Sequence, residues 1–276
     1  MACMNQTILI TGSSSGIGRA TAQHFQAQGW NVVATMRHPE KESELHQLDN
    51  VLVTRLDVED GASIEAAIAA GLARFGRIDA LLNNAGYGAY GPLEATPLAK
   101  IRRQFEVNVL GLLHTTQALL PHFRANRSGV ILNVSSIGGR ITFPLGTLYH
   151  GSKFAVEGLS EALHFELAPL GIRVKIIEPG MIKTDFAGRS FEFNNDPQLT
   201  EYQPLVQALF AALDPMVAIA SPPQLVAEAI YAAATDQTDQ LRYEVGPDAV
   251  QILASRRTTN DAQFLAGIRA QFQPGR

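Results

Sequence analysis

The chain has 276 residues, of which 46% are apolar, enough to build one large α/β domain around a single core. Its formal net charge is −4, and its basic residues form no run longer than the pairs at 102–103 and 256–257, which argues against a nucleic-acid-binding stripe. Cys3 is the only cysteine, which excludes an intrachain disulfide and a cysteine-based metal site, and no segment approaches the roughly 20 apolar residues of a membrane span. We therefore expect a cytoplasmic protein with no membrane insertion, no nucleic-acid partner and no bound metal.

Short runs of β-branched and aliphatic residues alternate along the chain with amphipathic stretches. The runs predict six or seven strands, at Thr7–Ile10, Asn31–Thr35, Val51–Leu56, Ala80–Leu82, Val130–Val134, Val174–Ile177 and, more weakly, Leu241–Val245. The amphipathic stretches predict helices at Gly16–Gln28, Ala62–Phe75, Pro97–Arg124, Gly151–Leu170 and Pro223–Thr235. This alternation is typical of a Rossmann-type, doubly wound α/β fold, in which a mostly parallel sheet carries helices on both faces.

Residues 181–222 interrupt the alternation. They fit neither a strand nor a simple helix, and they are rich in aromatic residues, Asn, Asp and Pro. A long excursion of this kind in a compact domain is usually functional. We therefore expect one dinucleotide-binding and catalytic domain over residues 1–276, with a substrate lid at about 181–222.

The first predicted strand runs directly into a glycine-rich turn and then into a helix. Gly12 permits a tight turn, Gly16 lets the backbone approach a pyrophosphate, and Gly18 allows close packing of helix on strand. The helix N-terminus adds unpaired N–H groups. The pattern T-G-x-x-x-G-x-G in this setting predicts a dinucleotide site; it is not a P-loop, because no Lys-Ser or Lys-Thr follows Gly18.

Tyr149 and Lys153 lie four residues apart near the start of a predicted helix, so their side chains project from one face, one turn apart. An ammonium group close to a tyrosine can lower its pKa from near 10 by about 1–3 units, which would let Tyr149 exchange a proton with a substrate oxygen. The same spacing is common on ordinary solvated helix faces. The weight of this pair therefore depends on the motifs that accompany it.

The complete set of motifs resembles the short-chain dehydrogenase/reductase family, and in particular its hydroxysteroid and retinol dehydrogenases. Besides the glycine turn, the set comprises Asp57-Val58, Asn83-Asn84-Ala85-Gly86, Asn108, Ser136, Tyr149-x-x-x-Lys153, Pro179-Gly180 and Thr184, in the family's order. The resemblance covers about residues 7–184 by motif. Beyond that it is architectural.

The resemblance implies an oxidoreductase that transfers hydride between a nicotinamide dinucleotide and an alcohol, ketone or aldehyde. It makes Tyr149 the general acid and base, with Ser136 on the substrate oxygen, Lys153 on the nicotinamide ribose and Asn108 supporting a water chain. Ser135 competes with Ser136, but it more plausibly finishes the strand. The implied cofactor-binding residues are Gly12, Ser13, Ser15, Gly16, Ile17, Gly18, Arg37, Asp57, Val58, Asn84, Ala85, Gly86, Tyr149, Lys153, Pro179, Gly180, Ile182 and Thr184.

Cofactor choice depends on the end of the second predicted strand. An acidic residue there would bond both ribose hydroxyls of NAD, but the chain has Met36 followed by Arg37. The guanidinium can pair with a 2′-phosphate, and Ser13 can add a hydrogen bond, so the sequence favours NADP(H), with NAD(H) possible. The competing interpretation is an exposed arginine that binds no ligand.

The substrate is predicted to be bulky and lipophilic, because the lid is rich in large apolar side chains: Phe191, Phe193, Tyr202, Leu205, Leu209, Phe210, Leu213 and Met216. We expect Tyr87, Phe143, Leu145, Met181 and Phe186 to contact it. Lys183 and Arg189 leave room for a charged substrate. The alternative is that these residues pack internally and leave a small pocket.

The rival to an enzyme is a dinucleotide-binding sensor or scaffold without turnover, since fold alone does not determine function. A sugar-nucleotide epimerase is a third option.

Residues 151–170 carry apolar side chains on more than one helix face, which predicts a homodimer or homotetramer. The role of residues 247–276 stays open.

Overall fold

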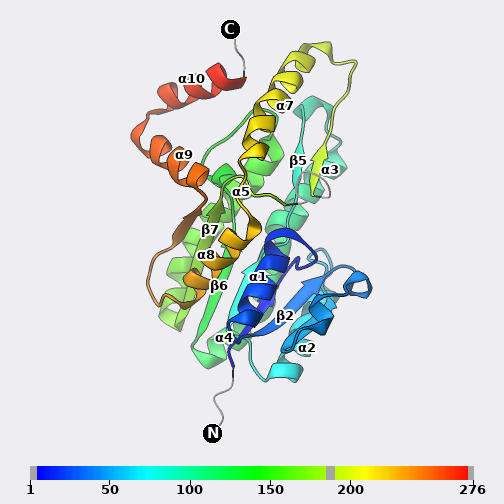
Figure 1. The fold of residues 1–276 in the computed structure, drawn as a ribbon, viewed down its shortest axis with the longest axis vertical. Coiled ribbons are helices and arrows are strands. Elements are labelled where there is room, and N and C mark those ends of the chain that lie inside the picture. The colour runs from blue at the N-terminus through cyan, green and yellow to red at the C-terminus, as the bar shows by residue number, and fades with distance from the viewer. Residues whose placement is uncertain (1–4, 185–189, 273–276) are drawn as a thin grey trace.

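The structure is a computed structural model, which describes residues 5–184 and 190–272. Its centre is a seven-stranded, fully parallel sheet with the strand order β3-β2-β1-β4-β6-β7-β9 (Figure 1). The strands are β1 Thr7–Ile10, β2 Asn31–Met36, β3 Val51–Arg55, β4 Ala80–Asn83, β6 Gly129–Val134, β7 Ile172–Pro179 and β9 Arg242–Val245. All seven predicted strands are therefore confirmed, and the doubly wound order places β1 and β4 side by side where the direction of winding reverses.

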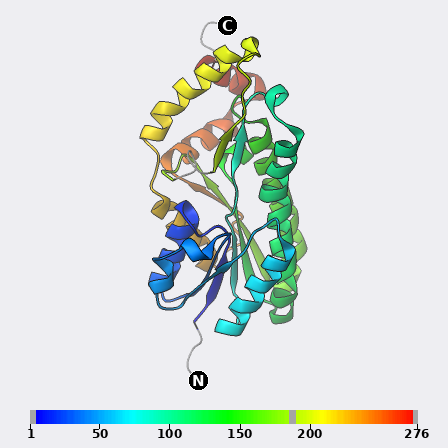
Figure 2. The same cartoon turned by 90° about the vertical axis from the view of Figure 1, so that its right-hand side faces the viewer.

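The sheet carries helices on both faces, as Figure 2 shows from the side. The helices α1 (Gly16–Ala27) and α8 (Pro223–Thr235) cover one face, where Phe25 and Ile230 belong to the same buried cluster as Ile8. On the other face lie α2 (Gly61–Phe75), α4 (Gly111–Asn126) and α5 (Thr147–Leu167). Strands buried on both faces have no polar side to expose, which explains why they appear in the sequence as continuous apolar runs.

The helix predicted over residues 97–124 is not continuous. It consists of α3 (Leu98–Phe105), a π-helical turn (Glu106–Leu110) and then α4. The π turn contains Asn108, whose side chain bonds the backbone of Tyr87. A π turn at this point re-aims one side chain without ending the helix, and such turns are frequent at functional sites.

The expectation that residues 181–222 lack a regular element is wrong. They contain the strand β8 (Phe191–Phe193), which pairs in parallel with β5 (Gly88–Tyr90), and the helix α7 (Gln203–Ala218). Proline obscured the helix in the sequence: Pro204 lies in its first turn, where the missing N–H is not needed, and Pro215 lies near its end. Both elements stand beyond the carboxyl ends of the main strands (Figure 1).

The remaining elements complete the described chain. After β9 come α9 (Pro247–Thr258) and α10 (Asp261–Phe272), and Phe272 packs on Phe143 with ring centroids 5.6 Å apart. Short 3₁₀ turns lie at Pro39–Lys41, Leu45–Gln47, Leu93–Ala95, Ile137–Gly139, Ala168–Leu170 and Thr200–Tyr202. Within residues 5–184 and 190–272, none of the helices combines the length and apolar character that crossing a bilayer requires.

Candidate active site

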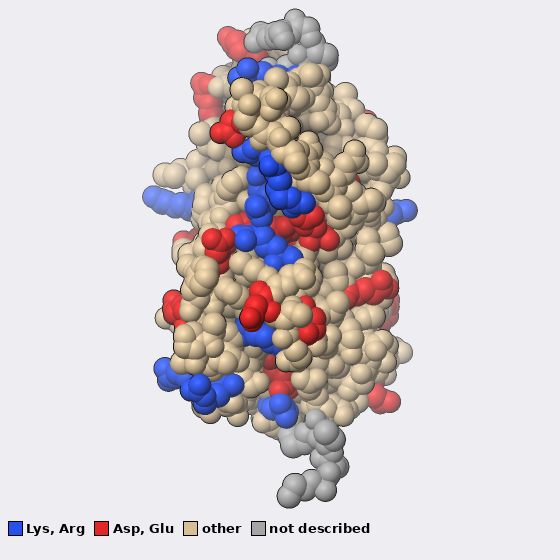
Figure 3. Space-filling model, turned by 90° about the vertical axis from the view of Figure 1, so that its left-hand side faces the viewer, with Lys and Arg blue, Asp and Glu red and all other residues tan. Residues whose placement is uncertain are grey.

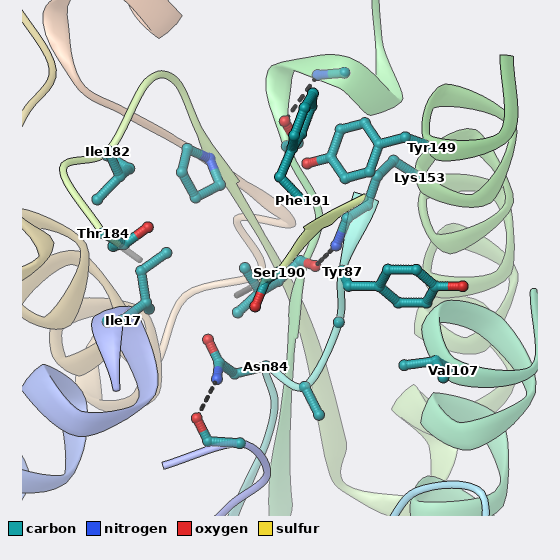
Figure 4. Close-up of a pocket in the computed structure, with 18 of the residues that line it drawn as sticks. Ile17, Asn84, Tyr87, Val107, Tyr149, Lys153, Ile182, Thr184, Ser190 and Phe191 are labelled. Atoms are coloured by element: carbon teal, nitrogen blue, oxygen red, sulfur yellow. Dashed lines mark hydrogen bonds between the residues drawn. The ribbon is translucent and has the colours of Figure 1, made fainter. Parts of the chain in front are cut away.

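A cavity of about 800 Å³ opens at the carboxyl ends of the sheet strands. One wall is the turn between β1 and α1, and the opposite wall carries Tyr149 and Lys153 of α5; Figure 4 shows Ile17 and Thr184 facing these two side chains across the gap. Because β1 and β4 diverge in their connections at this point, the cavity occupies the switch point where doubly wound sheets bind ligands.

The glycine turn fits a pyrophosphate. Gly12 and Gly16 adopt left-handed backbone angles with φ of 74° and 54°, and a Cβ on Gly18 would lie 2.2 Å from the carbonyl oxygen of Gly12. The residue before α1, Ser15, forms no side-chain cap, and the first turn has no acidic residue. The N–H groups of this turn therefore remain for an anion to accept from, in the positive end of the helix dipole.

Asn84 ties the end of β4 to the glycine turn. Its Nδ2 donates to the carbonyl oxygens of Thr11 and Gly12 at 2.9 and 3.1 Å, while the Thr11 hydroxyl accepts from the backbone N–H of Asn84 and Ala85. Asn83 bonds Thr116 and Asn133. These contacts make both asparagines braces, Asn84 for the glycine turn and Asn83 for the sheet.

The far end of the cavity lies beside β2. Arg37 is exposed there and lines the cavity together with Asp57 and Val58, and Met36, although nearly buried, also borders it. Ser13 does not reach this cavity: it is fully buried, and its hydroxyl donates to the carbonyl oxygen of Ile10 at 3.2 Å. The neighbouring serines at 14 and 15 line the cavity instead, so the expected contribution of Ser13 is corrected.

Tyr149, Lys153 and Ser136 converge at the other end. A hydrogen bond joins the Ser136 and Tyr149 side chains, and Lys153 Nζ donates to the carbonyl oxygen of Val134 at 2.8 Å. The ammonium lies 5.9 Å from the centre of the Tyr149 ring. Ser136 also caps the following 3₁₀ turn by accepting from Gly138 N.

Burial determines the charge states of this group. It raises the pKa of Tyr149, against a smaller lowering by the bond from Ser136, and it lowers the pKa of Lys153 to about 8, which Glu157 opposes. The expectation that Lys153 lowers the pKa of Tyr149 is therefore wrong within the protein itself. Burial of the neutral phenol dominates, so Tyr149 holds its proton.

Asn108 stands one layer behind the cavity. Its Oδ1 accepts from Tyr87 N at 3.0 Å, and its Nδ2 donates to Tyr87 O at 2.9 Å and to the Ser152 hydroxyl at 3.1 Å. The Ser152 hydroxyl in turn donates to the carbonyl oxygen of Tyr149. The buried Asn108 side chain thus connects the π turn to the first turn of α5.

An aromatic wall closes the substrate end. Tyr90, which the sequence did not single out, lies between Tyr149 and Phe191, with ring centroids 5.4 and 5.1 Å away. Burial raises the pKa of Tyr90 well above the ordinary value, so its hydroxyl stays neutral. Arg103 lies over the Tyr87 ring at 5.4 Å. The helix α7 adds Leu209, Phe210, Leu213, Asp214, Met216 and Val217 to the lining.

Most of the predicted residues surround this one cavity. Those that line it are Gly12, Ser15, Gly16, Ile17, Arg37, Asp57, Val58, Asn84, Ala85, Gly86, Tyr87, Ser136, Phe143, Tyr149, Lys153, Pro179, Gly180, Met181, Ile182 and Thr184. Ser13, Gly18, Asn108 and Leu145 do not line it, and Phe186 lies outside the described residues. Among the described residues, no group of three His, Cys, Asp or Glu side chains is placed to hold a metal ion.

The sequence matches known proteins along most of its length. A family model described as short chain dehydrogenase matches residues 6–195. An uncharacterized oxidoreductase of Schizosaccharomyces pombe is 48% identical over 236 residues, which cover 86% of this chain and 99% of that protein. The NADPH-dependent 3-dehydrocapnine reductase of Ornithobacterium rhinotracheale is 32% identical over 255 residues, 90% of each chain. The 17-beta-hydroxysteroid dehydrogenase type 1 of Mus musculus is 38% identical over 190 residues, 65% of this chain and 55% of that protein.

Solved structures resemble the fold over a similar span. A short-chain dehydrogenase from Streptomyces avermitilis superposes with a TM-score of 0.82 over 99% of this chain and all of its own, at 35% identity. ElxO with NADP bound has a TM-score of 0.71 over 87% of this chain and 97% of its own, at 29% identity. A short-chain dehydrogenase/reductase from Burkholderia phymatum in complex with NAD has a TM-score of 0.77 over 95% of each chain, at 26% identity.

Proposed function

The chain belongs to the short chain dehydrogenase family, and on this premise we propose that it reduces a bulky, lipophilic ketone or aldehyde with NADPH, or oxidises the corresponding alcohol. One observation carries the proposal: Tyr149, Ser136 and Lys153 converge in the same cavity that has the glycine turn at its other end. Family membership supports an oxidoreductase acting on C–OH and C=O groups. The aromatic and aliphatic side chains at the substrate end of the cavity support the narrower proposal of a bulky, lipophilic substrate.

The residues present fit a dinucleotide. The tight approach of Gly18 to Gly12 and the uncapped start of α1 form a cradle for the pyrophosphate, and Lys153 and Tyr149 would hold the nicotinamide ribose. When bound, the cofactor supplies or accepts the hydride. Asp57 and Val58 would contact the adenine end, where both line the cavity.

Tyr149 would exchange the proton. Because burial raises the pKa of Tyr149, its hydroxyl is protonated near neutral pH and is ready to donate to a carbonyl oxygen as negative charge develops there. Ser136 would donate a hydrogen bond to the same oxygen, a contact that strengthens as charge grows. Lys153, in its ammonium form, would stabilise the phenolate left on Tyr149. This arrangement favours reduction.

A preference for NADP(H) rests on Arg37. It follows β2 directly, lines the cavity and is exposed, and the end of that strand has buried Met36 where an NAD-binding carboxylate would stand. A guanidinium can bind a 2′-phosphate in bidentate fashion. Relatives support both cofactors, because one is named as NADPH-dependent and solved neighbours hold NADP or NAD.

The substrate end supports a lipophilic ligand. Tyr90, Phe191 and Phe210 present aromatic faces there, and burial of each methylene against such a wall contributes about 0.8 kcal/mol. We propose that residues 181–222 act as a lid of a single catalytic domain, which covers the substrate during turnover.

The proposal is tested by following NADPH absorbance with carbonyls of graded size and polarity. Turnover of a steroid-sized or long-chain aliphatic ketone, at least tenfold more efficient than that of acetoacetate-sized and sugar substrates, supports it. Efficient turnover of only the small polar compounds contradicts the lipophilic site. Cofactor binding without turnover across the whole panel would instead identify a sensor or scaffold.

We further propose a homodimer or homotetramer. Leu110, Phe154 and Phe165 are 49%, 44% and 70% exposed, and Phe154 and Phe165 lie on α5. Apolar side chains exposed on long helices are typical of contacts between subunits. A monomeric mass by light scattering at micromolar concentration would contradict this. Activity in the cytoplasm stays a prediction from the sequence.

A further inference from the structure

A cluster of buried charges lies behind Lys153, away from the cavity. Glu157 follows Lys153 by one turn of α5 and is only 5% exposed, and Glu178 at the end of β7 is fully buried. Arg242 of β9 reaches both, with its Nε 3.0 Å from Glu157 Oε2 and 3.4 Å from Glu178 Oε1. Arg140 Nη1 lies 3.1 Å from Glu178 Oε1.

Tight packing holds Glu157 beside Lys153. A Cβ on Gly139 would lie 2.6 Å from Ser135 Oγ, 2.9 Å from Glu157 Cγ and 2.9 Å from the carbonyl oxygen of Lys153. The end of β6, the following turn and α5 therefore meet at a point that only glycine can occupy. The Glu157 stem is thus packed at the point where these three elements meet.

The cluster is not saturated with hydrogen bonds. Glu157 Oε1, Glu178 Oε2 and Ser135 Oγ are buried with no hydrogen-bond partner among the described residues. A buried carboxylate oxygen without a partner is costly, so each such atom calls for an explanation. Proton transfer through Tyr149 involves none of these three atoms.

We propose that Glu157 is a positioning residue, whose buried carboxylate, one turn from Lys153 on α5, stabilises the Lys153 ammonium, and that the ion pair with Arg242 holds this carboxylate in place. The proposal rests on the proposed function, because it assigns Glu157 a role through Lys153 and Tyr149. It adds a residue to the reaction that touches neither the substrate nor the cofactor.

The balance of charges around Lys153 explains why such a residue is needed. Burial lowers the pKa of Lys153 to about 8, and the negative charge of Glu157 opposes that lowering. The Lys153 ammonium donates only to a neutral carbonyl oxygen, and Tyr149 beside it holds its proton. Without Glu157 the pKa of Lys153 would fall further, which would favour its neutral form.

Near neutral pH Glu178 carries only part of its charge, which weakens its competition with Glu157 for Arg242. Burial and the charge of Glu157 raise the pKa of Glu178 to about 7, against Arg140 and Arg242, so it takes up a proton there. Arg242 then pairs mainly with Glu157 and with exposed Glu161, whose Oε2 lies 2.6 Å from Arg242 Nη2. Arg257, which is paired with Glu244, also interacts electrostatically with Glu178.

Solvent reaches the outer end of the cluster. Arg140 lines a second cavity of about 260 Å³ with Leu253, Arg256 and Arg257. This cavity lies at α9, on the side of the molecule that Figure 3 shows, where basic and acidic side chains intermix rather than forming a patch of one sign.

The experiment is an NMR titration of isotope-labelled lysine side chains in the full chain without cofactor. The chain has few lysines, at positions 41, 100, 153, 175 and 183, and Lys153→Arg identifies the resonance of interest. In Glu157→Gln we expect the midpoint of Lys153 to fall by about one pH unit. The buried Lys175, which bonds Asp236 on the far side of the sheet, should not move.

The matched control is Glu161→Gln, because Glu161 lies one turn further along α5 and bonds the same arginine from the surface. It should leave the Lys153 midpoint unchanged. An unmoved midpoint in Glu157→Gln, or an equal shift in Glu161→Gln, overturns the proposal. Should Glu157→Gln fail to fold, Glu157→Met removes the same charge without introducing a buried amide and is judged by the same criteria.

A second readout uses turnover. In Glu157→Gln, the alkaline limb of the pH profile of kcat/KM for ketone reduction should move to lower pH by the same amount as the Lys153 midpoint. Loss of rate with an unmoved limb would mean a merely structural role. A wild-type protein without any turnover would contradict the proposed function and still leave the titration of Lys153 to decide this inference.

Discussion

The glycine-turn wall and the aromatic wall of the cavity are built in different ways. On the first, backbone conformation determines every position: Gly12 and Gly16 have positive φ, and Gly18 has no room for a Cβ. On the second, the positions depend on side chains from distant segments, as when Tyr90 of β5 packs against Phe191 of β8. The first wall is therefore local in the sequence and intolerant of change, whereas the second is non-local and can vary with the ligand.

We expect the largest loss of activity from a change in the catalytic group that includes Tyr149, which lies between the glycine-turn wall and the aromatic wall. In Tyr149→Phe we expect kcat for reduction to fall by about 10²- to 10⁴-fold, because only the transferable proton is lost. Binding of NADPH, followed by fluorescence, should be retained. Tyr231→Phe, in the aromatic cluster with Phe25 and Trp30 on the far side of α1, should be unchanged. A Tyr149→Phe variant with most of the wild-type rate would refute the assignment.

Arg37, at the end of the cavity beside β2, should determine the preference between NADPH and NADH. In Arg37→Ala the ratio of kcat/KM for NADPH over NADH should fall by about ten- to a hundredfold, as expected for loss of hydrogen bonds to a charged group. Arg55→Ala is the control, because Arg55 pairs in register with Met36 but bonds Asp60 outside the cavity. A clear preference for NADH that is unchanged in Arg37→Ala would show that this arginine does not discriminate between NADPH and NADH.

The rigidity of the glycine-turn wall predicts an effect on stability. Gly18→Ala would bring a methyl group to 2.2 Å from the Gly12 carbonyl oxygen, and we expect a loss of about 1–3 kcal/mol in the free energy of unfolding, with weaker NADPH binding. Gly158→Ala on α5 meets nothing within 4 Å and should stabilise the protein by up to about 1 kcal/mol. Denaturant unfolding measures both. Equal changes in the free energy of unfolding for Gly18→Ala and Gly158→Ala would show that the glycine-turn wall is no more sensitive to substitution than an open position on a helix.

The aromatic wall should respond least, and only with large substrates. Phe191→Ala removes the ring that packs on Tyr90, and kcat/KM for a long-chain ketone should fall by about three- to tenfold while that for a small ketone changes little. The exposed Phe165→Ala serves as the control. An equal loss for both substrates would indicate that Phe191 supports the fold of the site rather than the substrate.

The sequence predicted what local constraints determine. The strands were recognisable because a sheet buried on both faces needs continuous apolar runs, and the glycine turn was recognisable because each glycine has one steric reason to be there. Tyr149 and Lys153 were found from their spacing on one helix together with the accompanying motifs of the family that the sequence resembles. The cofactor-side residues at 57–58 and 84–86 follow strand ends, and parallel strands bring their carboxyl ends to one edge.

The parts that the sequence did not reveal depend on long-range packing. Which serine of the run 13–15 faces inward is decided by the carbonyl oxygen of Ile10, which accepts from Ser13. The π turn at Asn108 follows from bonds to Tyr87 and leaves no periodic signal. The charge state of Tyr149 is controlled by burial, which depends on Tyr90 and β8 rather than on the lysine one turn away.

The parallel pair of β5 and β8 also determines the order in which the two walls can form as the chain folds. Its contacts join segments about a hundred positions apart, since Asn194 Nδ2 and Tyr90 O are separated by 104 residues, and closing so long a loop is slow and entropically costly. The turn between β1 and α1 is braced by residues that lie nearer in the sequence, such as Asn84, which is 72 residues from Gly12. A nascent chain can therefore form the glycine-turn wall early in synthesis. The aromatic wall can form only after residue 193 has been synthesised. Because the last unit to form is commonly the first to exchange its amide hydrogens, the substrate end can open to the solvent while the dinucleotide end stays folded.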